Sequence, residues 1–305
     1  MKRSVLSRFG VVCGAALLVA APASTDAAVL FSDSFNRPDS RDIDGDATGV
    51  VNNTSTSFAA SAIYSQPQLD PNNADPTNDV QDADATNGGG ALIAGEQLNL
   101  AVGAGTSNAF VNHNFVDASI LADGGFTVSL DVAGYAQGTN GQGAGFAVGM
   151  SQAEAASTRD VFSGPARMNG GSGSVIGNNV AAEVVSDFWV FLRGNSSLAW
   201  GSNDGSAISG SVGLPAKTGV IQAAFRFTDF NSGSNVEYSV FYDGMLQGTG
   251  SFVWSGDNEN YIGIDARDSQ AVMVDNFVVA SLPEPTAAVL GLIGLVAAAR
   301  RRREG

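Results

Sequence analysis

The chain has 305 residues, with 30 acidic and 15 basic side chains and a formal net charge of −15. Seven basic but only three acidic residues lie outside 29–282, so that stretch has 8 basic and 27 acidic residues, a net charge of −19. A charge of this size and sign repels nucleic acids and anionic lipid, and it argues against nucleic acid as a partner.

The first 28 residues have the pattern of a signal peptide, which predicts export. A basic n-region is formed by Lys2, Arg3 and Arg8. An apolar run over residues 11–21 follows, and residues 21–23 (Ala-Pro-Ala) fit the small-x-small pattern that signal peptidase cuts. Cuts after Ala27 or Ala28 fit equally well. Cys13 is removed with the peptide, so the exported chain holds its fold by burial and hydrogen bonding or by bound metal, without disulfides.

An acidic loop near the start of the exported chain is a candidate calcium site. Asp42, Asp44 and Asp46 place carboxylates at alternate positions, as hard oxygen-ligand loops begin. Ala47 and Asn53 stand where an EF-hand needs glycine and glutamate, so an EF-hand is not expected. A second acidic loop covers residues 70–84. A solvated acidic loop is the competing interpretation of both, and structural Ca²⁺ is the hypothesis.

Period-two alternation fills residues 29–282 and predicts strands bounded by turn residues. The expected strands are residues 126–132, 144–150, 182–192, 219–227 and 236–242, with 261–265 and 271–279 as the last pair. Asp243-Gly244 predicts a two-residue hairpin turn, and only residues 151–159 are predicted to be helical. One all-β antiparallel β-sandwich of about 250 residues accounts for this pattern.

The strand sequences resemble those of LamG or concanavalin-A-like jelly rolls. The matching segments are residues 31–37, 238–244, 261–265 and 274–277. The resemblance implies that the first and last strands pair, which would bring Phe35 near Phe277. Because this fold carries lectins, glycosidases, lyases and inert spacers, it leaves the activity open.

The catalytic patterns of this fold are missing from the sequence. A retaining glycanase of the family places two carboxylates on one strand face as Glu-x-Asp-x-Glu, and no such string occurs; residues 183–187 have the wrong spacing. His113 is the only histidine, and we interpret it as a hydrogen-bonded loop or strand-edge residue. A lyase that uses His113 with a tyrosine remains an unsupported alternative. No catalytic residue is therefore assigned.

Three tryptophans are candidates for stacking on sugar rings. Trp189 lies in an apolar segment and is expected in the core. Trp200 and Trp254 precede polar loops, so they are the candidate glycan-binding residues; a role in capping the sandwich core is the alternative.

The carboxyl-terminal segment, residues 283–305, has the pattern of a sorting tail. Residues 286–299 give about 14 residues of apolar helix, about 21 Å long, which is short against about 30 Å of hydrocarbon. A basic cluster that stays cytoplasmic follows at Arg300, Arg301, Arg302 and Arg303. The span predicts transient membrane anchoring, and a permanently tail-anchored protein is the alternative.

Pro283, Glu284 and Pro285, followed by this short span and the arginines, resemble the PEP-CTERM signal of exported bacterial proteins. The resemblance covers the tail alone. It implies recognition of these residues by an exosortase-like membrane transpeptidase and delivery to the cell surface or to an extracellular polysaccharide matrix. The sequence thus predicts a non-catalytic surface or matrix protein, with glycan binding as its candidate role. A secreted polysaccharide-degrading enzyme, a glycosidase or lyase, is the alternative.

Overall fold

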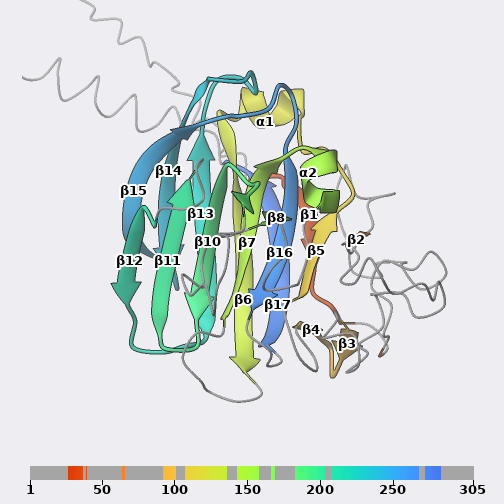
Figure 1. Cartoon of the computed structure of the whole chain (residues 1–305), viewed down its shortest axis with the longest axis vertical. Coiled ribbons are helices and arrows are strands. Elements are labelled where there is room, and N and C mark those ends of the chain that lie inside the picture. Colours follow the sequence, from red (N-terminus) through yellow and green to blue (C-terminus); the bar gives the residue numbers. More distant parts are fainter. Residues whose placement is uncertain are drawn as a thin grey trace, which may run out of the picture. The chain divides into compact units, whose positions relative to one another are not determined.

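The computed structural model describes the central part of the chain. The described residues are 27–36, 39, 64–65, 92–100, 107–135, 143–157, 166–168, 183–202, 208–267 and 272–282. They form two antiparallel sheets that face each other (Figure 1). The prediction of an all-β antiparallel sandwich is therefore confirmed.

The first sheet, called sheet A, has its strands in the order β15-β14-β13-β6-β17-β4-β3, and β1 also pairs with β17. Its strands are β1 (Val29–Asp33), β3 (Leu92–Ala94), β4 (Gln97–Leu100), β6 (Gly125–Tyr135), β13 (Gly219–Arg226), β14 (Asn235–Tyr242), β15 (Met245–Val253) and β17 (Val272–Ser281). Burial alternates along β6, β13 and β14, because one face of this sheet packs on the core while the other meets solvent.

The second sheet, called sheet B, has its strands in the order β12-β11-β10-β7-β16-β5-β2. Its strands are β2 (Tyr64–Ser65), β5 (Ser107–Val111), β7 (Gly143–Met150), β10 (Phe188–Arg193), β11 (Ser197–Ser202), β12 (Gly210–Gly213) and β16 (Tyr261–Arg267). Two short strands, β8 (Ala166–Arg167) and β9 (Glu183–Val184), form a separate parallel pair.

Two short helices complete the described elements. The first, α1 (Ala118–Ala122), was not predicted; Asp117 caps it by accepting a hydrogen bond from the Ser119 amide. The second, α2 (Gln152–Ser157), lies within the predicted helix at 151–159. Among the described residues, no helix is long and apolar enough to cross a membrane.

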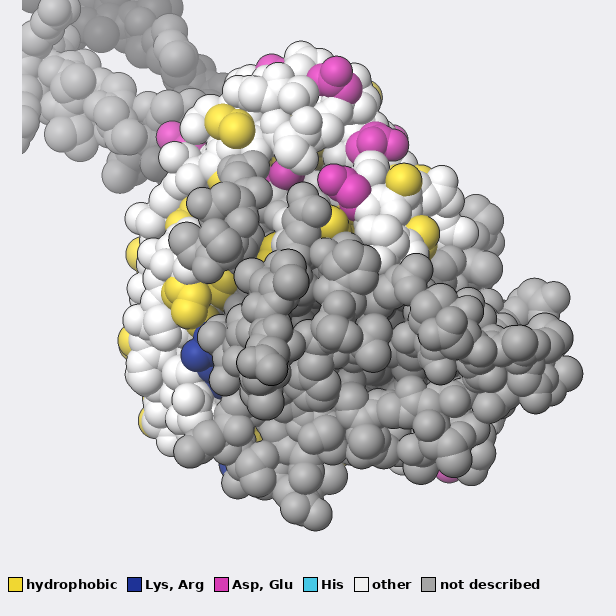
Figure 2. Space-filling view, viewed as in Figure 1, with side chains coloured by type: hydrophobic (Ala, Val, Ile, Leu, Met, Phe, Trp, Pro, Cys, Tyr) yellow, Lys and Arg dark blue, Asp and Glu magenta, His cyan; other side chains and the backbone are white. Residues whose placement is uncertain are grey.

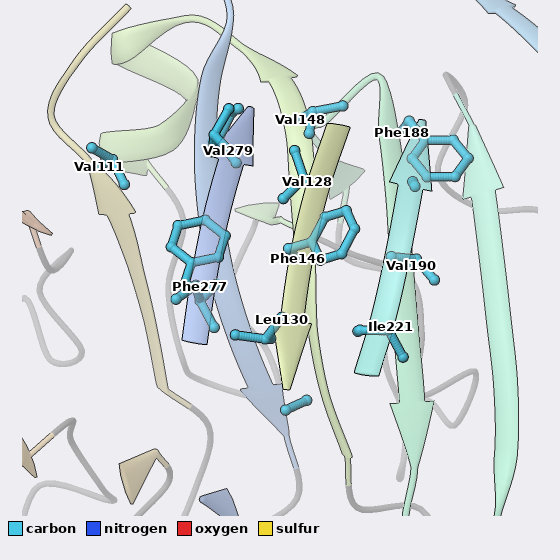
Figure 3. Packing of buried hydrophobic residues seen from close by; sticks show 14 of the residues in the cluster. Val111, Val128, Leu130, Phe146, Val148, Phe188, Val190, Ile221, Phe277 and Val279 are labelled. Atoms are coloured by element: carbon cyan, nitrogen blue, oxygen red, sulfur yellow. The ribbon is translucent and has the colours of Figure 1, made fainter. Parts of the chain in front are cut away.

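The core between the sheets is built from the inward positions of both. Figure 3 shows β6, β13 and β17 contributing residues such as Leu130, Ile221 and Phe277, which face Phe146 on β7 and Val190 on β10. All five of these side chains are fully buried. Burial of this apolar area is the main stabilising term, since a chain with one cysteine forms no internal disulfide.

Sheet B is buried on its outer face as well, which explains why β7 is buried along its whole length. A second apolar cluster forms there around Trp189 and Phe191 of β10 and Phe110 of β5. Met168 packs over Gly263, where an added Cβ would lie 2.4 Å from its sulfur. The prediction that Trp189 belongs to the core is confirmed, although its cluster lies outside the sandwich interior.

The first and last strands of the sandwich pair as predicted. β1 runs antiparallel to β17, with Asp33 opposite Phe277, and the rings of Phe31 and Phe277 are 5.8 Å apart. Beyond the strands, the Ala28 amide donates to Ser281 Oγ at 3.0 Å and the Ser281 amide donates to the Ala28 carbonyl at 2.8 Å. The first and last segments of the described sandwich are therefore hydrogen-bonded to each other and lie side by side.

Two strand predictions were wrong. The predicted strand 182–192 is divided into β9 and β10. The division falls at Asp187, which turns inward and whose amide donates a hydrogen bond to the Val148 carbonyl on β7. The expected last pair does not form: β16 belongs to sheet B and β17 to sheet A, so these two consecutive strands lie in opposite layers.

The predicted hairpin at Asp243-Gly244 is confirmed and offers a test of the fold. Both residues have positive φ, 46° and 74°, as a type I′ turn requires. Gly244→Ala should lower the free energy of unfolding by about 1–2 kcal/mol, since alanine resists the left-handed conformation. Gly213→Ala is the control, because a Cβ there meets nothing within 4 Å. Urea unfolding measures the free energy of unfolding of both variants. Equal losses of stability in the Gly244→Ala and Gly213→Ala variants would contradict this description of the turn.

Candidate functional site

An open hollow lies on the outer face of sheet A, across β13, β14 and β15. It has a volume of about 490 Å³ and is lined by Ala224, Arg226, Asn235, Glu237, Tyr238, Ser239, Thr249, Gly250 and Ser251. A second hollow of about 510 Å³ shares Arg226, Asn235 and Glu237 and continues over Gly124, Phe227, Thr228 and Ser234. We call the two together the sheet A groove. Its shared residues make it a single elongated surface.

Strand register explains which side chains meet in the groove. Glu237 lies opposite Arg226 on one side and Ser251 on the other. Ser239 occupies the next outward row, opposite Thr249. Directly opposite residues lie only about 5 Å apart at Cβ, so these side chains are neighbours on the surface. The short serine and threonine side chains form the floor of the groove, and the longer Arg226 and Glu237 side chains stand beside them.

The charge balance of the groove differs from that of the whole chain. Arg226 and Glu237 cancel in formal charge, and the remaining lining residues are neutral. The chain as a whole carries −15. The hydroxyls, the amide of Asn235 and the two charged groups supply both donors and acceptors for hydrogen bonds. Such a surface suits an uncharged ligand rich in hydroxyl groups better than a cation or an anion.

Trp200 lies beneath this surface rather than on it, and it is only 6% exposed. The indole packs against the backbone of two facing strands, where a Cβ on Gly210 or Gly248 would lie 2.1 or 2.3 Å from it. The expectation that Trp200 stacks on a sugar is corrected, because no ring face is open. Bare glycine positions let the edge strands close over the ring.

Trp254 is buried too, at 1% exposed, in an aromatic cluster at one end of the sandwich. Its ring stacks on Phe230 at 5.6 Å between centroids and meets Phe227 and Phe252 edge-on. The expectation of a glycan-stacking role is corrected here as well. The alternative given for both tryptophans, capping the sandwich core, describes their positions.

The loops above this aromatic cluster are tied together by polar groups. The Ser232 amide donates to Asp257 Oδ1 at 2.7 Å, and the Ser232 hydroxyl donates to the Ser255 carbonyl at 2.8 Å. Hydrogen bonds from the Ser234 hydroxyl and then from the Asn231 amide lower the pKa of Asp229. Figure 2 shows acidic side chains at the α1 and α2 end of the molecule, where Asp117 and Asp123 flank α1. This end is a fixed, acidic rim.

Asp187 is a buried acid at the same end. It is 2% exposed, and its Oδ2 accepts a hydrogen bond from the Ser255 amide at 3.0 Å. Burial raises the pKa of the carboxyl to about 7, even though Ser255 acts in the opposite direction. Gly149 makes room for it, because a Cβ there would lie 2.6 Å from Asp187 Cβ. Asp187 joins β7, β10 and the loop after β15.

A pair of carboxylates also occupies the outer face of sheet A, away from the groove. Asp131 on β6 lies opposite Asp275 on β17. Desolvation, followed by the charge of Asp243, raises the pKa of Asp131; desolvation and the charges of Asp131, Asp33 and Glu96 raise that of Asp275. Neither residue lines either hollow.

His113 lies in the bend directly after β5, as predicted for a strand-edge residue. Its amide donates to the Val111 carbonyl at 2.7 Å, and its ring meets Phe115 edge-on at 5.0 Å. Desolvation lowers its pKa, against the opposing charge of Asp117. These contacts fit the structural interpretation of this residue.

Several predicted site residues lie outside the described residues. They are the calcium candidates Asp42, Asp44 and Asp46 and the sorting residues Pro283, Glu284, Pro285, Arg300, Arg301, Arg302 and Arg303. Within the described ranges, no group of three or more His, Cys, Asp or Glu side chains could hold a metal ion. Calcium binding and sorting remain predictions.

The groove was not predicted from the sequence. The outward polar positions of residues 219–227 and 236–242 were readable from their alternation. The predicted hairpin at Asp243-Gly244 already joins β14 to β15. The pairing of β13 with β14 that sets Arg226 beside Glu237 depends on register and was not predicted.

No protein-family model and no curated protein sequence matches the chain. Among solved structures, the potassium-bound carbohydrate recognition domain of Emp46p is similar over 63% of this chain and 86% of that domain, with 10% identity and a TM-score of 0.43. A legume lectin-like domain from Entamoeba histolytica is similar at 12% identity, 63% and 87% coverage and a TM-score of 0.39. A prokaryotic β-1,3-1,4-glucanase from a mouse hindgut metagenome is similar over 63% of this chain and 82% of that enzyme, with 9% identity and a TM-score of 0.35. Similarity this distant assigns neither ligand nor activity.

The buried carboxyl of Asp187 predicts a pH dependence of stability. A group with a folded pKa of about 7 against an ordinary 3.8 binds a proton in the folded state and not in the unfolded one between these values. Stability contributed by this group is therefore greatest below pH 4 and falls as pH rises toward 7. Asp187→Asn should flatten that fall and raise the melting temperature at pH 8 by several degrees.

Differential scanning calorimetry from pH 4 to pH 8 measures this effect. The matched control is Asp257→Asn, which removes an exposed carboxylate from the adjoining loop. Equal pH profiles for the Asp187→Asn variant and the unmodified protein would contradict the assignment.

Proposed function

We propose that the chain is an exported, non-catalytic surface or matrix protein whose sandwich binds a neutral polysaccharide along the sheet A groove. One observation carries the proposal: an elongated polar hollow, balanced in charge, lies on the open face of a strongly acidic chain. Neutral glycans present many hydroxyls, each able to donate and accept, and no charge to be repelled or attracted.

The shape of the groove favours a chain over a single sugar. The two hollows join through Arg226, Asn235 and Glu237, so a ligand can extend from Thr249 toward Thr228. The described lining residues include no exposed aromatic ring for stacking, and hydrogen bonds to an open surface contribute little each. Affinity should therefore be weak per site, which suits a protein that acts at high density in a matrix.

The fastened ends of the sandwich support the proposed route of export. Ala28 and Ser281 form two hydrogen bonds with each other. The proposed signal peptide ends at or shortly before Ala28, and the proposed sorting tail begins at Pro283, just after Ser281. A folded sandwich can thus form while both segments are held at one membrane. Signal peptidase would release the first segment and an exosortase-like transpeptidase the second.

The groove proposal predicts the effect of two substitutions. Arg226→Ala and Glu237→Ala should each weaken retention of the protein by a neutral polysaccharide, such as dextran, laminarin or lichenan, about tenfold, since each removes charge-assisted hydrogen bonds. Affinity gel electrophoresis at increasing polysaccharide concentration measures the retention.

Lys217→Ala is the matched control for Arg226→Ala, because it removes one positive charge from the loop between β12 and β13, outside the groove. Unchanged retention in both groove variants would refute the site. Release of reducing sugar ends that Asp131→Asn abolishes would instead establish the enzymatic alternative, which the adjacent carboxylates of Asp131 and Asp275 favour.

The tail proposal predicts a change of location. Replacing Pro283, Glu284 and Pro285 together with alanine should leave the protein in the membrane fraction of a host that makes an exosortase-like enzyme. The short apolar span then stays attached, because its recognition residues are gone. Immunoblots of membrane and medium fractions measure this, with Thr286→Ala as the control. Equal release of the triple variant and the control would argue against such recognition.

A further inference from the structure

An aromatic side chain, Phe241, stands on the solvent-facing side of sheet A. The outward positions of β14 recur at every second residue from Asn235 to Phe241, while Tyr238 and Tyr242 on the same strand point into the core. Phe241 is half-buried and belongs to neither of the two apolar clusters. The structure describes every residue of β13, β14 and β15, and no other outward position on these strands carries an aromatic ring. Core packing therefore does not account for this ring.

Phe241 lies on the extension of the sheet A groove. The two hollows overlap along β13 and β14, so the groove follows the strands from Thr228 to Ser239. Phe241 follows Ser239 by two residues on the same face, a rise of about 7 Å along the strand. Its direct neighbours across the strands are Gln222 on β13 and Leu246 on β15. A chain-like ligand that follows the groove past Ser239 therefore reaches the ring of Phe241 next.

Two exposed apolar side chains flank this ring. Leu246 is 57% exposed and lies opposite Phe241. Val220 is 40% exposed and lies on the same face, two residues before Gln222 on β13. We call Val220, Phe241 and Leu246 the Phe241 platform. Apolar side chains gathered on one exposed face mark an interaction surface.

The chemistry around the platform selects a neutral ligand with hydroxylated edges and apolar faces. Gln222 and Ser239 border the ring without charge, and each offers a hydrogen-bond donor and acceptor. Asp131 lies opposite Val220 and bounds the platform with a carboxylate, which repels an anionic ligand. The hydroxyl groups of a pyranose project from the edge of its ring, and C–H bonds cover its faces, which can stack on an aromatic side chain.

The stereochemistry of the sugar decides how closely it can lie on a ring. In a β-linked glucan, the hydroxyls and the glycosidic bonds of each unit are equatorial, so both faces are flat. An α-linked mannan carries an axial hydroxyl and an axial glycosidic bond, which hold the sugar away from an aromatic face. A flat ring beside the groove therefore favours β-linked glucans over α-mannan.

We propose that Phe241 is the stacking residue of the sheet A groove and makes the groove selective for β-linked glucans. This inference rests on the proposed function, because the polysaccharide reaches Phe241 by lying along the groove. The ring contacts one face of a sugar unit, while Gln222 and Ser239 exchange hydrogen bonds with its edge. The stacking contact adds to hydrogen bonds that contribute little each on an open surface.

Phe241→Leu and Phe241→Trp test the stacking role. Leucine keeps an apolar partner for Leu246 but offers no flat face, so retention by lichenan, a β-linked glucan, should weaken about fivefold. Tryptophan keeps a flat ring, so its retention by lichenan should equal or exceed that of the unmodified protein. Affinity gel electrophoresis measures both variants in lichenan and in α-mannan, which is also neutral. The α-mannan should retain the unmodified protein less, and Phe241→Leu should leave that weaker retention unchanged.

The ratio of the two retentions separates stacking from a structural role, because a loss of folding would weaken retention by both glycans alike. The proposal fails if lichenan retains Phe241→Leu like the unmodified protein, if Phe241→Trp loses as much retention as Phe241→Leu, or if α-mannan retains the unmodified protein as strongly as lichenan does.

Arg226→Ala distinguishes failure of this inference from failure of the groove itself. Weakened retention of Arg226→Ala with unchanged retention of Phe241→Leu would keep the groove and remove the stacking role. Absence of retention of the unmodified protein by both glycans would refute the groove and the stacking role together.

Discussion

Pairing of the first strand with the last is the constraint on which the rest of the sandwich depends. β1 lies against β17, and β17 also pairs with β6 and β4, so β17 stands at the centre of sheet A. Phe31 and Phe277 carry this pairing into the core. Residues more than 240 positions apart must meet before sheet A is complete, which makes the fold rich in non-local contacts and slow to form. The same pairing fastens Ala28 to Ser281, so the ends of the described sandwich leave from neighbouring strands.

The two sheets differ in how their outer faces are covered. Sheet B is apolar on both faces, and its outer cluster around Trp189 is closed over by Met168. Sheet A keeps one face in solvent, and that face carries the balanced groove, the Asp131 and Asp275 pair and the uncharged edge at β15. Glycan binding is therefore proposed for this solvent-facing side of sheet A. A surface of this kind suits a protein that works by contact with a matrix, where many weak sites act together.

Local signals in the sequence predicted local structure, and long-range packing decided the rest. The hairpin at Asp243-Gly244 was predictable because its turn chemistry lies in two adjacent residues. The break at Asp187 was not, since it depends on contacts with two residues distant in the sequence, Val148 and Ser255. Trp200 stands beside polar residues in the sequence and suggests exposure, yet Gly210 and Gly248 on two other strands make room to bury it. The groove escaped prediction for the same reason: its residues are ordinary strand residues until register sets Arg226 beside Glu237.

Export with removal of both end segments is the central claim, and the mass of the released protein tests it most directly. Intact-mass spectrometry of protein collected outside the cells should show a chain that begins between residues 24 and 29 and ends before Arg300. Both cuts would then lie next to the fastened strands β1 and β17. A released chain that still carries Arg303 would contradict the account, because its short apolar span would have left the membrane without being cut.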